Sequence, residues 1–320
     1  MLGSPAIRVR GLGDSEARGV VFQERRLPPA VEADRCDVFF SPAYSCPRRL
    51  AAPRVTAVHD LSFFSLPQDF TWRDGLRRRL GVKASLEVSA GVLACSDFTR
   101  REILARFPEV VSRVHHVPLG ADDDVPPGPP RDEARKRLAV TGPLVLTVGA
   151  ILNRRRLPEL LRAVASLRRR FPDVVLDVVG ENRTHPRRDL EGLVRSLDLD
   201  GAVRLSGFVS DADLALRYAA ADVACSLSEY EGFGLPALEA LSRGLPLVTS
   251  LRPALGEIFG EAALLVDPAD VPGIAAALDR VLGDGLLGSD LARRGRALAA
   301  RFSWQRTAAL TWDVLEAAAR

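Results

Sequence analysis

The chain alternates short apolar runs with longer mixed segments, at a spacing typical of alternating β-strands and helices. The first series of apolar runs comprises "DVFFSP" (37–42), "RVTAVHD" (54–60), "GVLACS" (91–96) and "RVHHVP" (113–118). The second comprises "PLVLTVGA" (143–150), "VVLDVVG" (174–180), "VRLSGF" (203–208), "DVACSLS" (222–228), "PLVTS" (246–250) and "AALLVDP" (262–268). Helical segments lie between them, including 72–88, 97–106, 157–170 and 211–220. Continuous Val, Leu and Ile runs separated by helices predict an α/β protein with two parallel, doubly wound sheets.

The two series divide the chain into two Rossmann-like halves. Between them, "ADDDVPPGPPRDEARK" (121–136) is acidic and then proline-rich, which predicts a linker. We therefore expect an N-terminal domain over 1–125, a linker over 126–142, a C-terminal domain over 143–302 and a final helix over 303–320. Two such domains place a ligand in the cleft between them, at the carboxyl ends of the strands.

Composition argues against several classes of function. The net charge of +3 and the isoelectric point of about 8.9 are too weakly basic to indicate a nucleic-acid partner. The four cysteines are scattered without C-x-x-C spacing, so we expect a reducing, cytoplasmic setting without structural zinc. We identify no signal peptide and no apolar run near the roughly 20 residues of a membrane span. The basic segment 72–88 suits either peripheral contact with an anionic membrane or an ordinary solvated helix face.

The stretch "SEYEGFGLPALEA" (228–240) carries the strongest indication of chemistry. Two glutamates, Glu231 and Glu239, are separated by seven residues and flank two glycines and Pro236. The glycines indicate a tight loop after a strand. Because proline is favoured in the first turn of a helix, we predict a helix from about Pro236 to Gly244, with Glu239 near its N-terminal end.

Such a loop has a clear binding chemistry. Glycines let a ligand approach the backbone closely, and the free N–H groups of a helix start suit a diphosphate. A carboxylate on each side of the loop can accept hydrogen bonds from the hydroxyls of two sugars. The stretch therefore suits a nucleotide-diphosphate sugar, although from the residues alone a turn with two solvated glutamates is an equally good interpretation.

The same stretch resembles the nucleotide-sugar motif of the family-4 glycosyltransferases, retaining enzymes with the two-domain GT-B fold. In that family an E-x7-E pair flanks a "GFG-P" loop, as in "SEYEGFGLPALEALSRGLPLVTS" (228–250). Further segments resemble family motifs in family order: "VTAVHDLSFFSLPQDF", "ACSDFTRREI", "VHHVPLGAD", "VGAILNRRRLPELLRAV" and "FSWQRTAAL". The resemblance runs from about residue 20 onward. It implies a GT-B fold in which the final helix, 303–320, crosses back to the N-terminal domain.

The resemblance also implies a role for each matching residue. Glu239 would bind the nucleotide ribose and Glu231 the donor sugar, while His59 would lie over that sugar near its anomeric carbon. Arg154 and Arg155 match a basic pair that would face the leaving diphosphate. The loop that would hold the diphosphate and sugar through its backbone consists of Gly232, Phe233, Gly234 and Leu235. The family generally needs no metal, so "DDD" (122–124) and "DLD" (198–200) are interpreted as linker and helix-end acids.

The chain departs from the family pattern in two ways. Leu119 and Arg156 each stand where the family has an asparagine. In addition, family members begin with a strand and a glycine-rich loop, which residues 1–35 do not supply. We therefore expect a truncated N-terminal domain, short of about two βα units, with an exposed apolar edge or face near 37–42 and 54–59.

The resemblance implies a retaining glycosyltransferase without metal or other cofactor. Its donor would be a nucleotide-diphosphate sugar, with GDP-mannose favoured, and its acceptor a glycan or glycolipid, including lipid-linked forms, in polysaccharide biosynthesis. One alternative is a truncated protein that binds nucleotide without turnover. A GT-B-type epimerase or phosphorylase would lack the "EGFGLP" loop in this spacing, and a nicotinamide-dependent dehydrogenase would need a G-x-G-x-x-G that is absent.

Overall fold

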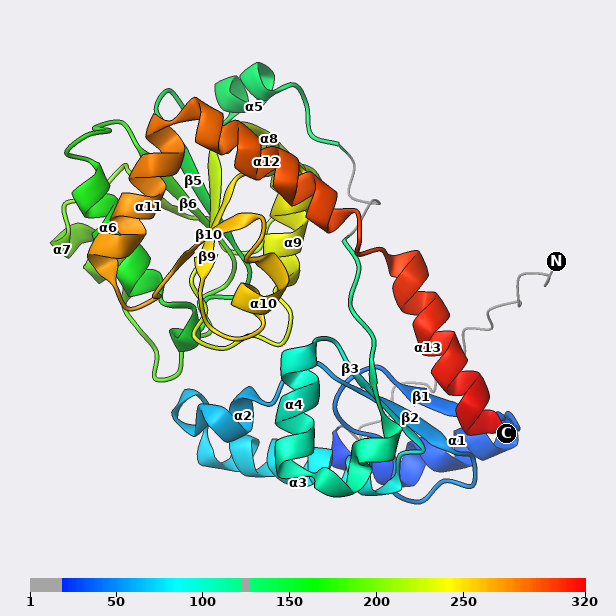
Figure 1. Ribbon diagram of the computed structural model, residues 1–320. Helices are drawn as coiled ribbons and strands as arrows, with labels where there is room; N and C mark the ends of the chain where they lie inside the picture. Colours follow the sequence, from blue (N-terminus) through cyan, green and yellow to red (C-terminus); the bar gives the residue numbers. More distant parts are fainter. Residues whose placement is uncertain (1–18, 122–126) are drawn as a thin grey trace.

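The computed structural model describes residues 19–121 and 127–320, which form two halves, each built on its own parallel sheet (Figure 1). Within these residues the N-terminal sheet has four strands, in the order β1-β2-β3-β4. The C-terminal sheet has six, in the order β10-β9-β8-β5-β6-β7. The two parallel, doubly wound sheets expected from the sequence are thus confirmed. The strands are β1 (Phe39–Ser41), β2 (Arg54–Val58), β3 (Gly91–Ala94), β4 (Val114–His116), β5 (Leu144–Val148), β6 (Val175–Val179), β7 (Val203–Leu205), β8 (Val223–Ser226), β9 (Leu247–Ser250) and β10 (Ala263–Val266).

Helices connect the strands, and several begin at a capping side chain. The hydroxyls of Thr71 and Ser96 accept hydrogen bonds from the backbone N–H groups of Asp74 (3.2 Å) and Thr99 (3.0 Å). Such caps satisfy N–H groups that the first helical turn leaves free, and they set the starts of α3 and α4. The helices are α1 (Leu27–Ala33), α2 (Ser62–Ser65), α3 (Trp72–Val88), α4 (Asp97–Arg106), α5 (Arg131–Arg137), α6 (Leu157–Leu167), α7 (Leu190–Ser196), α8 (Asp211–Ala220), α9 (Leu235–Ser242), α10 (Leu255–Phe259), α11 (Val271–Gly283), α12 (Gly285–Ala299) and α13 (Trp304–Ala319).

Both faces of the C-terminal sheet are covered by helices of the same half. Leu144 and Leu146 of β5 lie in a core with residues of α8, α9 and α10. Val145, between them, lies in a second core with residues of α6, α7 and α11. Successive side chains of a strand point to opposite faces, so this alternation is expected of a strand buried on both sides.

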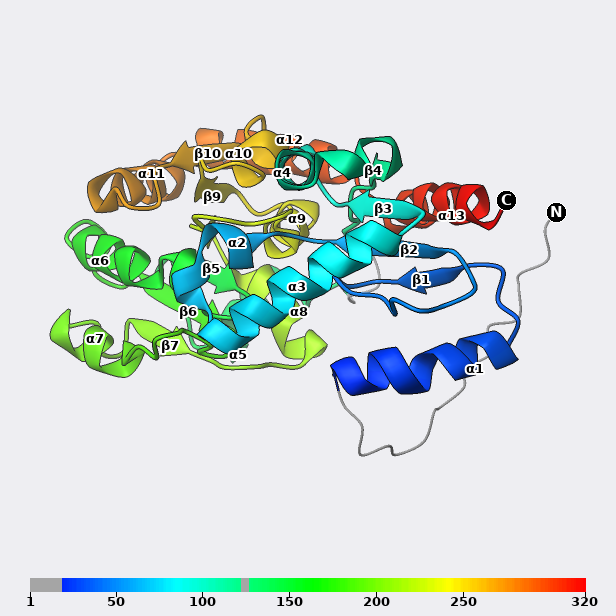
Figure 2. The same cartoon turned by 90° about the horizontal axis from the view of Figure 1, so that it is seen from below.

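The N-terminal sheet is covered on its two faces by helices from opposite ends of the chain. On one face, Leu86 of α3 and Ile103 of α4 pack against β2 and β3. On the other face lies α13, which leaves the C-terminal half after α12 and runs alongside the N-terminal sheet (Figures 1 and 2). Its Val314 packs against Val55, Ala57, Leu93 and Val117. The last helix of the chain therefore covers one face of the N-terminal sheet.

The predicted linker over 126–142 contains a helix, which corrects the sequence interpretation. Ala134 of α5 is fully buried in the core of the C-terminal half, where α5 packs on α8. Arg135 Nη1 lies 3.0 Å from the Asp222 carboxylate, which also pairs with Arg131. The helix has acids in its first turn and bases in its last, as the helix dipole favours, and the prolines before it hide this pattern in the sequence.

The expected exposure of the N-terminal sheet is confirmed in one place and wrong in another. Among the described strands β1 is an edge strand, and its Phe40 is 37% exposed. In contrast, Val55 and Val58 of β2 are fully buried, because α13 covers one face of this strand and α3 the other. The segments "AIRVR" (6–10) and "GLG" (11–13) lie outside the described residues.

Candidate active site

A cavity of about 620 Å³ lies between the two halves, at the carboxyl ends of β2 and β3 and beside the loop that leads from β8 to α9. Its N-terminal wall is largely apolar and includes Phe40, Ala57 and Leu93, and α13 adds Trp304. Most of the site residues predicted from the sequence line this cavity: His59, Arg155, Glu231, Gly232, Phe233, Gly234 and Leu235. Arg154 and Glu239 are not part of the lining.

Two glycines give the loop after β8 its path. Gly234 caps α9 with φ +97°, in the left-handed region that favours glycine, and Pro236 lies in the first turn of the helix. Gly232 lies against the other half. A Cβ added to it would stand 1.6 Å from the carbonyl oxygen of His59, so only glycine allows the two halves to come this close.

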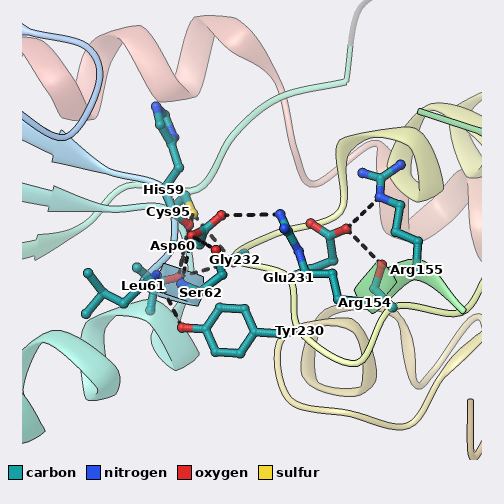
Figure 3. A network of polar contacts seen from close by, with 12 residues as sticks. His59, Asp60, Leu61, Ser62, Cys95, Arg154, Arg155, Tyr230, Glu231 and Gly232 are labelled. Atoms are coloured by element: carbon teal, nitrogen blue, oxygen red, sulfur yellow. Dashed lines mark hydrogen bonds and ion pairs between the residues drawn. The ribbon is translucent and has the colours of Figure 1, made fainter. Parts of the chain in front are cut away.

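Glu231 is held by neighbours from its own half (Figure 3). Its Oε1 accepts hydrogen bonds from the Ser228 hydroxyl (2.8 Å) and from Arg155 Nε (3.1 Å). Arg155 Nη1 in turn donates to the carbonyl of Val148 at the end of β5 (3.0 Å). The side chains of Glu231 and Arg155 are only 13% and 24% exposed, so this charge pair is weakly screened by solvent. The cavity thus contains a fixed carboxylate and a fixed guanidinium side by side.

His59 enters the cavity from the carboxyl end of β2. Its Nε2 lies 2.7 Å from the carbonyl oxygen of Pro42. A carbonyl only accepts, so Nε2 carries a proton and donates it to Pro42. The Tyr44 ring packs edge-on against the imidazole, with ring centroids 5.7 Å apart. Burial, and next the nearby Asp60 carboxylate, raise the pKa of Tyr44, so its hydroxyl stays neutral.

The structure directs Arg154 and Arg155 to different partners. Whereas Arg155 lines the cavity, Arg154 Nη2 lies 4.0 Å from Asp60 Oδ2 of the N-terminal half, with both side chains mostly buried (Figure 3). The carbonyl of Arg154 accepts a hydrogen bond from the Glu229 N–H (2.7 Å). Arg156, at φ +50°, pairs with Glu229 at 2.8 Å. Arg154 and Asp60 thereby form an ion pair between the halves.

Glu239 lies on α9, the helix that follows the glycine loop. Its Oε2 accepts a hydrogen bond from the Tyr218 hydroxyl (3.1 Å). Arg243 lies over the Tyr218 ring, 5.0 Å from its centroid. Burial, and next the Glu239 charge, raise the pKa of Tyr218 well above its usual value, so this hydroxyl remains a donor. The two glutamates of the E-x7-E pair are therefore each oriented by a separate set of neighbours.

Several residues of the site were not singled out from the sequence. Asp60 directly follows His59, and Tyr230 directly precedes Glu231, so both stood inside motifs that had been noticed. Cys95 and Thr99 come from "ACSDFTRREI" (94–103), which resembles a family motif but gave neither residue a role. Their position against the loop after β8 is a consequence of how the two halves meet.

No group of three or more His, Cys, Asp and Glu residues that could hold a metal ion occurs in the described part of the chain. The acids at 122–124 lie outside that part, and those at 198–200 lie in the turn before β7, where Leu199 is fully buried. Within residues 19–121 and 127–320 no helix combines the length and the apolar character needed to cross a bilayer.

The comparison with protein families identifies the chain. The sequence pattern of the glycosyl transferases group 1 matches residues 130–298, slightly more than half of its length. The chain belongs to the group 1 glycosyltransferases. The matched region contains the glycine loop, both glutamates of the E-x7-E pair and the two arginines at 154–155.

Curated relatives of the chain include two mannosyltransferases. The chain is 33% identical to the O-antigen chain mannosyltransferase B of Escherichia coli over 294 residues, which is 89% of this chain and 75% of that protein. It is 38% identical to the MMP alpha-(1->4)-mannosyltransferase of Mycolicibacterium hassiacum over 231 residues, 71% of this chain and 54% of that protein. A third relative, at 34% identity over 236 residues, is the glycogen synthase of Mycobacterium tuberculosis, with 72% of this chain and 55% of that protein covered.

Solved structures agree with the fold. The sucrose-phosphate synthase of Thermosynechococcus elongatus superposes with a TM-score of 0.75 at 26% identity, over 90% of this chain and 77% of that one. The Anabaena protein HepE in complex with UDP and glucose superposes with a TM-score of 0.77 at 20% identity, over 93% and 83% of the two chains. Both similarities support the GT-B arrangement of two facing halves.

Proposed function

We propose that this group 1 glycosyltransferase is a retaining enzyme that takes a sugar from a nucleotide-diphosphate donor, with GDP-mannose as the favoured donor. The observation that carries the proposal is the pairing of Glu231 and Arg155 at a glycine loop that faces His59 across one cavity. The mannosyltransferases among the relatives support mannose over other sugars.

The proposed donor pose follows from the chemistry of the C-terminal half. The N–H groups of Gly232 to Leu235 lie at the start of α9, where the helix dipole favours a diphosphate. Glu239 would accept hydrogen bonds from the ribose, and Glu231 from the sugar. Arg155 would turn part of its guanidinium from Glu231 toward the phosphate charge that grows as the sugar leaves, which is the largest expected contribution to catalysis.

The proposed transfer keeps the configuration at the anomeric carbon. The acceptor hydroxyl would attack on the face from which the diphosphate departs, and a phosphate oxygen would take the hydroxyl proton. His59, on the opposite wall of the cavity, would lie over the sugar near this carbon and stabilise the bound sugar through its position. Arg155 supplies the fixed positive charge in this scheme, so we propose a reaction without metal or other cofactor.

We further propose a glycan or lipid-linked acceptor in polysaccharide biosynthesis, reached at an anionic membrane surface. On α3, Trp72, Leu76 and Leu80 are exposed at 71%, 45% and 59% and follow one another at four-residue spacing. The exposed positions beside them include Arg73, Arg77 and Lys83. An exposed helix face of apolar and basic side chains suits the headgroup region of an anionic bilayer.

The donor proposal is tested by calorimetric binding of GDP, UDP and ADP, followed by turnover assays with GDP-mannose and other nucleotide sugars. We expect binding of one nucleoside diphosphate and transfer of its sugar, with product NMR showing the anomeric configuration of the donor. An inverted product would refute the retaining mechanism. Binding without any turnover would favour the alternative of a nucleotide-binding protein that lacks activity.

The membrane proposal is tested by co-sedimentation with vesicles of phosphatidylglycerol and phosphatidylcholine. Binding should require the anionic lipid, weaken with salt and fall in a Trp72→Ser, Leu80→Ser double variant. Exchange of Leu286, which is 86% exposed on α12 of the other half, for serine is the matched control. Equal binding to both lipids, or no binding, would refute peripheral attachment through α3.

A further inference from the structure

Tyr230, the residue before Glu231 in the loop after β8, is held by contacts with the N-terminal half. The Tyr230 hydroxyl accepts a hydrogen bond from the Leu61 N–H at 3.2 Å (Figure 3). It donates one to Glu102 Oε2, also at 3.2 Å. The Tyr230 ring packs edge-on against Phe98, with centroids 5.3 Å apart. Every one of these partners belongs to the N-terminal half, although Tyr230 itself belongs to the C-terminal half.

Gly232, the residue after Glu231, is also held by contacts with the N-terminal half. The carbonyl oxygen of Gly232 lies 3.4 Å from the Thr99 hydroxyl and 3.4 Å from the Cys95 thiol. These two donors also reach the His59 carbonyl, at 3.3 Å and 3.0 Å. Each has one hydrogen, so together they can satisfy one carbonyl from each half. Thr99 is fully buried at this point, where water cannot replace it.

Glu231 therefore has two kinds of support. Its carboxylate is held by Arg155 and Ser228 of its own half, but the backbone on either side of it is fixed by the other half. When the halves separate, Tyr230 and Gly232 lose these partners, and the loop of Glu231 loses two fixed points. Domain closure of this kind occurs in many enzymes that close around a ligand.

Resting on the proposed function of Glu231, we propose that Tyr230 and Thr99 are positioning residues that couple closure of the two halves to the orientation of Glu231 toward the donor sugar. Neither side chain touches the reacting atoms. Their effect is to make the sugar-binding geometry complete only in the closed form, while the nucleotide can already bind to the C-terminal half in the open form. A nucleoside diphosphate and a nucleotide sugar should then depend differently on closure.

The first experiment measures closure directly. Cys36 is exposed in the N-terminal half and the other cysteines are buried, so spin labels on Cys36 and on Leu286→Cys report the distance between the halves. In the ligand-free protein, Tyr230→Phe and Thr99→Val should increase the long-distance population. Thr99→Ser keeps the hydroxyl and should behave like wild type. Arg101→Gln removes an exposed ion pair between the halves, to Glu257, without touching the loop, and should change little.

The second experiment separates binding from transfer. With the nucleotide sugar that the wild type uses, Tyr230→Phe and Thr99→Val should lower kcat roughly 10-fold, since each removes a hydrogen bond made only in the closed form. The affinity for the nucleoside diphosphate should stay within about twofold, because that ligand contacts the C-terminal half. If the two residues had a purely structural role, the variants would instead have a lower melting temperature and a lower affinity for both ligands. Thr99→Ser would then not restore kcat.

Unchanged label distances in both variants would overturn the proposal, and so would changed distances with an unchanged kcat. If the wild type bound no nucleotide at all, the proposed function would fail. The label distances would still decide whether Tyr230 and Thr99 hold the halves closed, so the two failures can be told apart.

Discussion

The two halves of the molecule differ in how each completes its fold. The C-terminal half buries both faces of its sheet beneath its own helices, and its β5 alternates between two cores. The N-terminal half has a smaller sheet and receives Val314 of α13 from the far end of the chain to cover one face. The candidate site is divided in the same way. The C-terminal half contributes the glycine loop, Glu231, Arg155 and Glu239. The N-terminal half contributes His59.

This difference teaches that the core of the C-terminal half is covered by its own helices, whereas the half bearing His59 depends on a helix from the far end of the chain. A change at the covering helix should therefore damage one half and spare the other. A change at the contact between the halves should spare both folds and damage only what they do together.

The largest effect is expected from Val314→Asp. Val314 is 7% exposed and packs on β2 and β3, so a carboxylate there would be buried without a partner and should destabilise the N-terminal half by about 3 kcal/mol. Calorimetry should show one early unfolding transition and one near its original temperature. The neighbouring exposed Asp313→Ala should shift neither transition. A uniform shift of a single transition would show that the halves do not differ in this way.

Gly232→Ala should come next, because it acts on the contact between the halves. The backbone of Gly232 tolerates alanine, but the added Cβ would overlap the His59 carbonyl at 1.6 Å and keep the cleft from closing. Turnover should fall about 100-fold, as expected when reacting groups are misplaced by about an ångström. Nucleoside diphosphate affinity and the melting temperature should change little. Retained turnover would mean that the close approach is not needed for transfer.

Glu239→Ala and His59→Ala should sharpen the comparison at the level of binding. Removing the proposed ribose acceptor should weaken nucleoside diphosphate affinity by about 2 kcal/mol, roughly 30-fold, since charge-assisted hydrogen bonds are lost. His59→Ala should leave that affinity unchanged and lower turnover only, because His59 lies in the other half. Isothermal calorimetry checks both variants. Equal losses of affinity in the two would contradict the division of labour between the halves.

The smallest effect concerns the cysteines. Burial raises the pKa of Cys95, at the contact between the halves, to about 12, and it does the same for Cys225 inside the C-terminal half. At neutral pH both thiols are almost entirely protonated, so iodoacetamide should modify the exposed Cys36 first. In Gly232→Ala, Cys95 should then react faster than Cys225, as followed by mass spectrometry. Equal rates for these two thiols would show that the cleft does not open there.

Local patterns of the sequence determined the secondary structure and much of the candidate site. The apolar runs predicted the strands of both halves, and α3, α4 and α8 have the predicted bounds of 72–88, 97–106 and 211–220. In the structure each of these helices begins at a capping serine or threonine. The glycine loop and the E-x7-E spacing predicted a site at the carboxyl end of the C-terminal sheet, where the loop after β8 lies. These features follow from interactions within a few residues, such as a hydroxyl that caps its own helix, and such interactions are visible in a short window of sequence.

Tertiary structure alone decided which neighbouring residues do different things. Arg154 and Arg155 are adjacent and chemically identical, yet one pairs with Asp60 across the cleft and the other with Glu231 in the cavity. Part of the predicted linker is helical because Ala134 of α5 is buried where α5 packs on α8. Gly232 lies against His59, and Tyr230 against Leu61, although more than half of the chain separates each pair in sequence. These contacts join residues whose own neighbours in sequence carry no trace of the partner, so they exist only once both halves have folded and met.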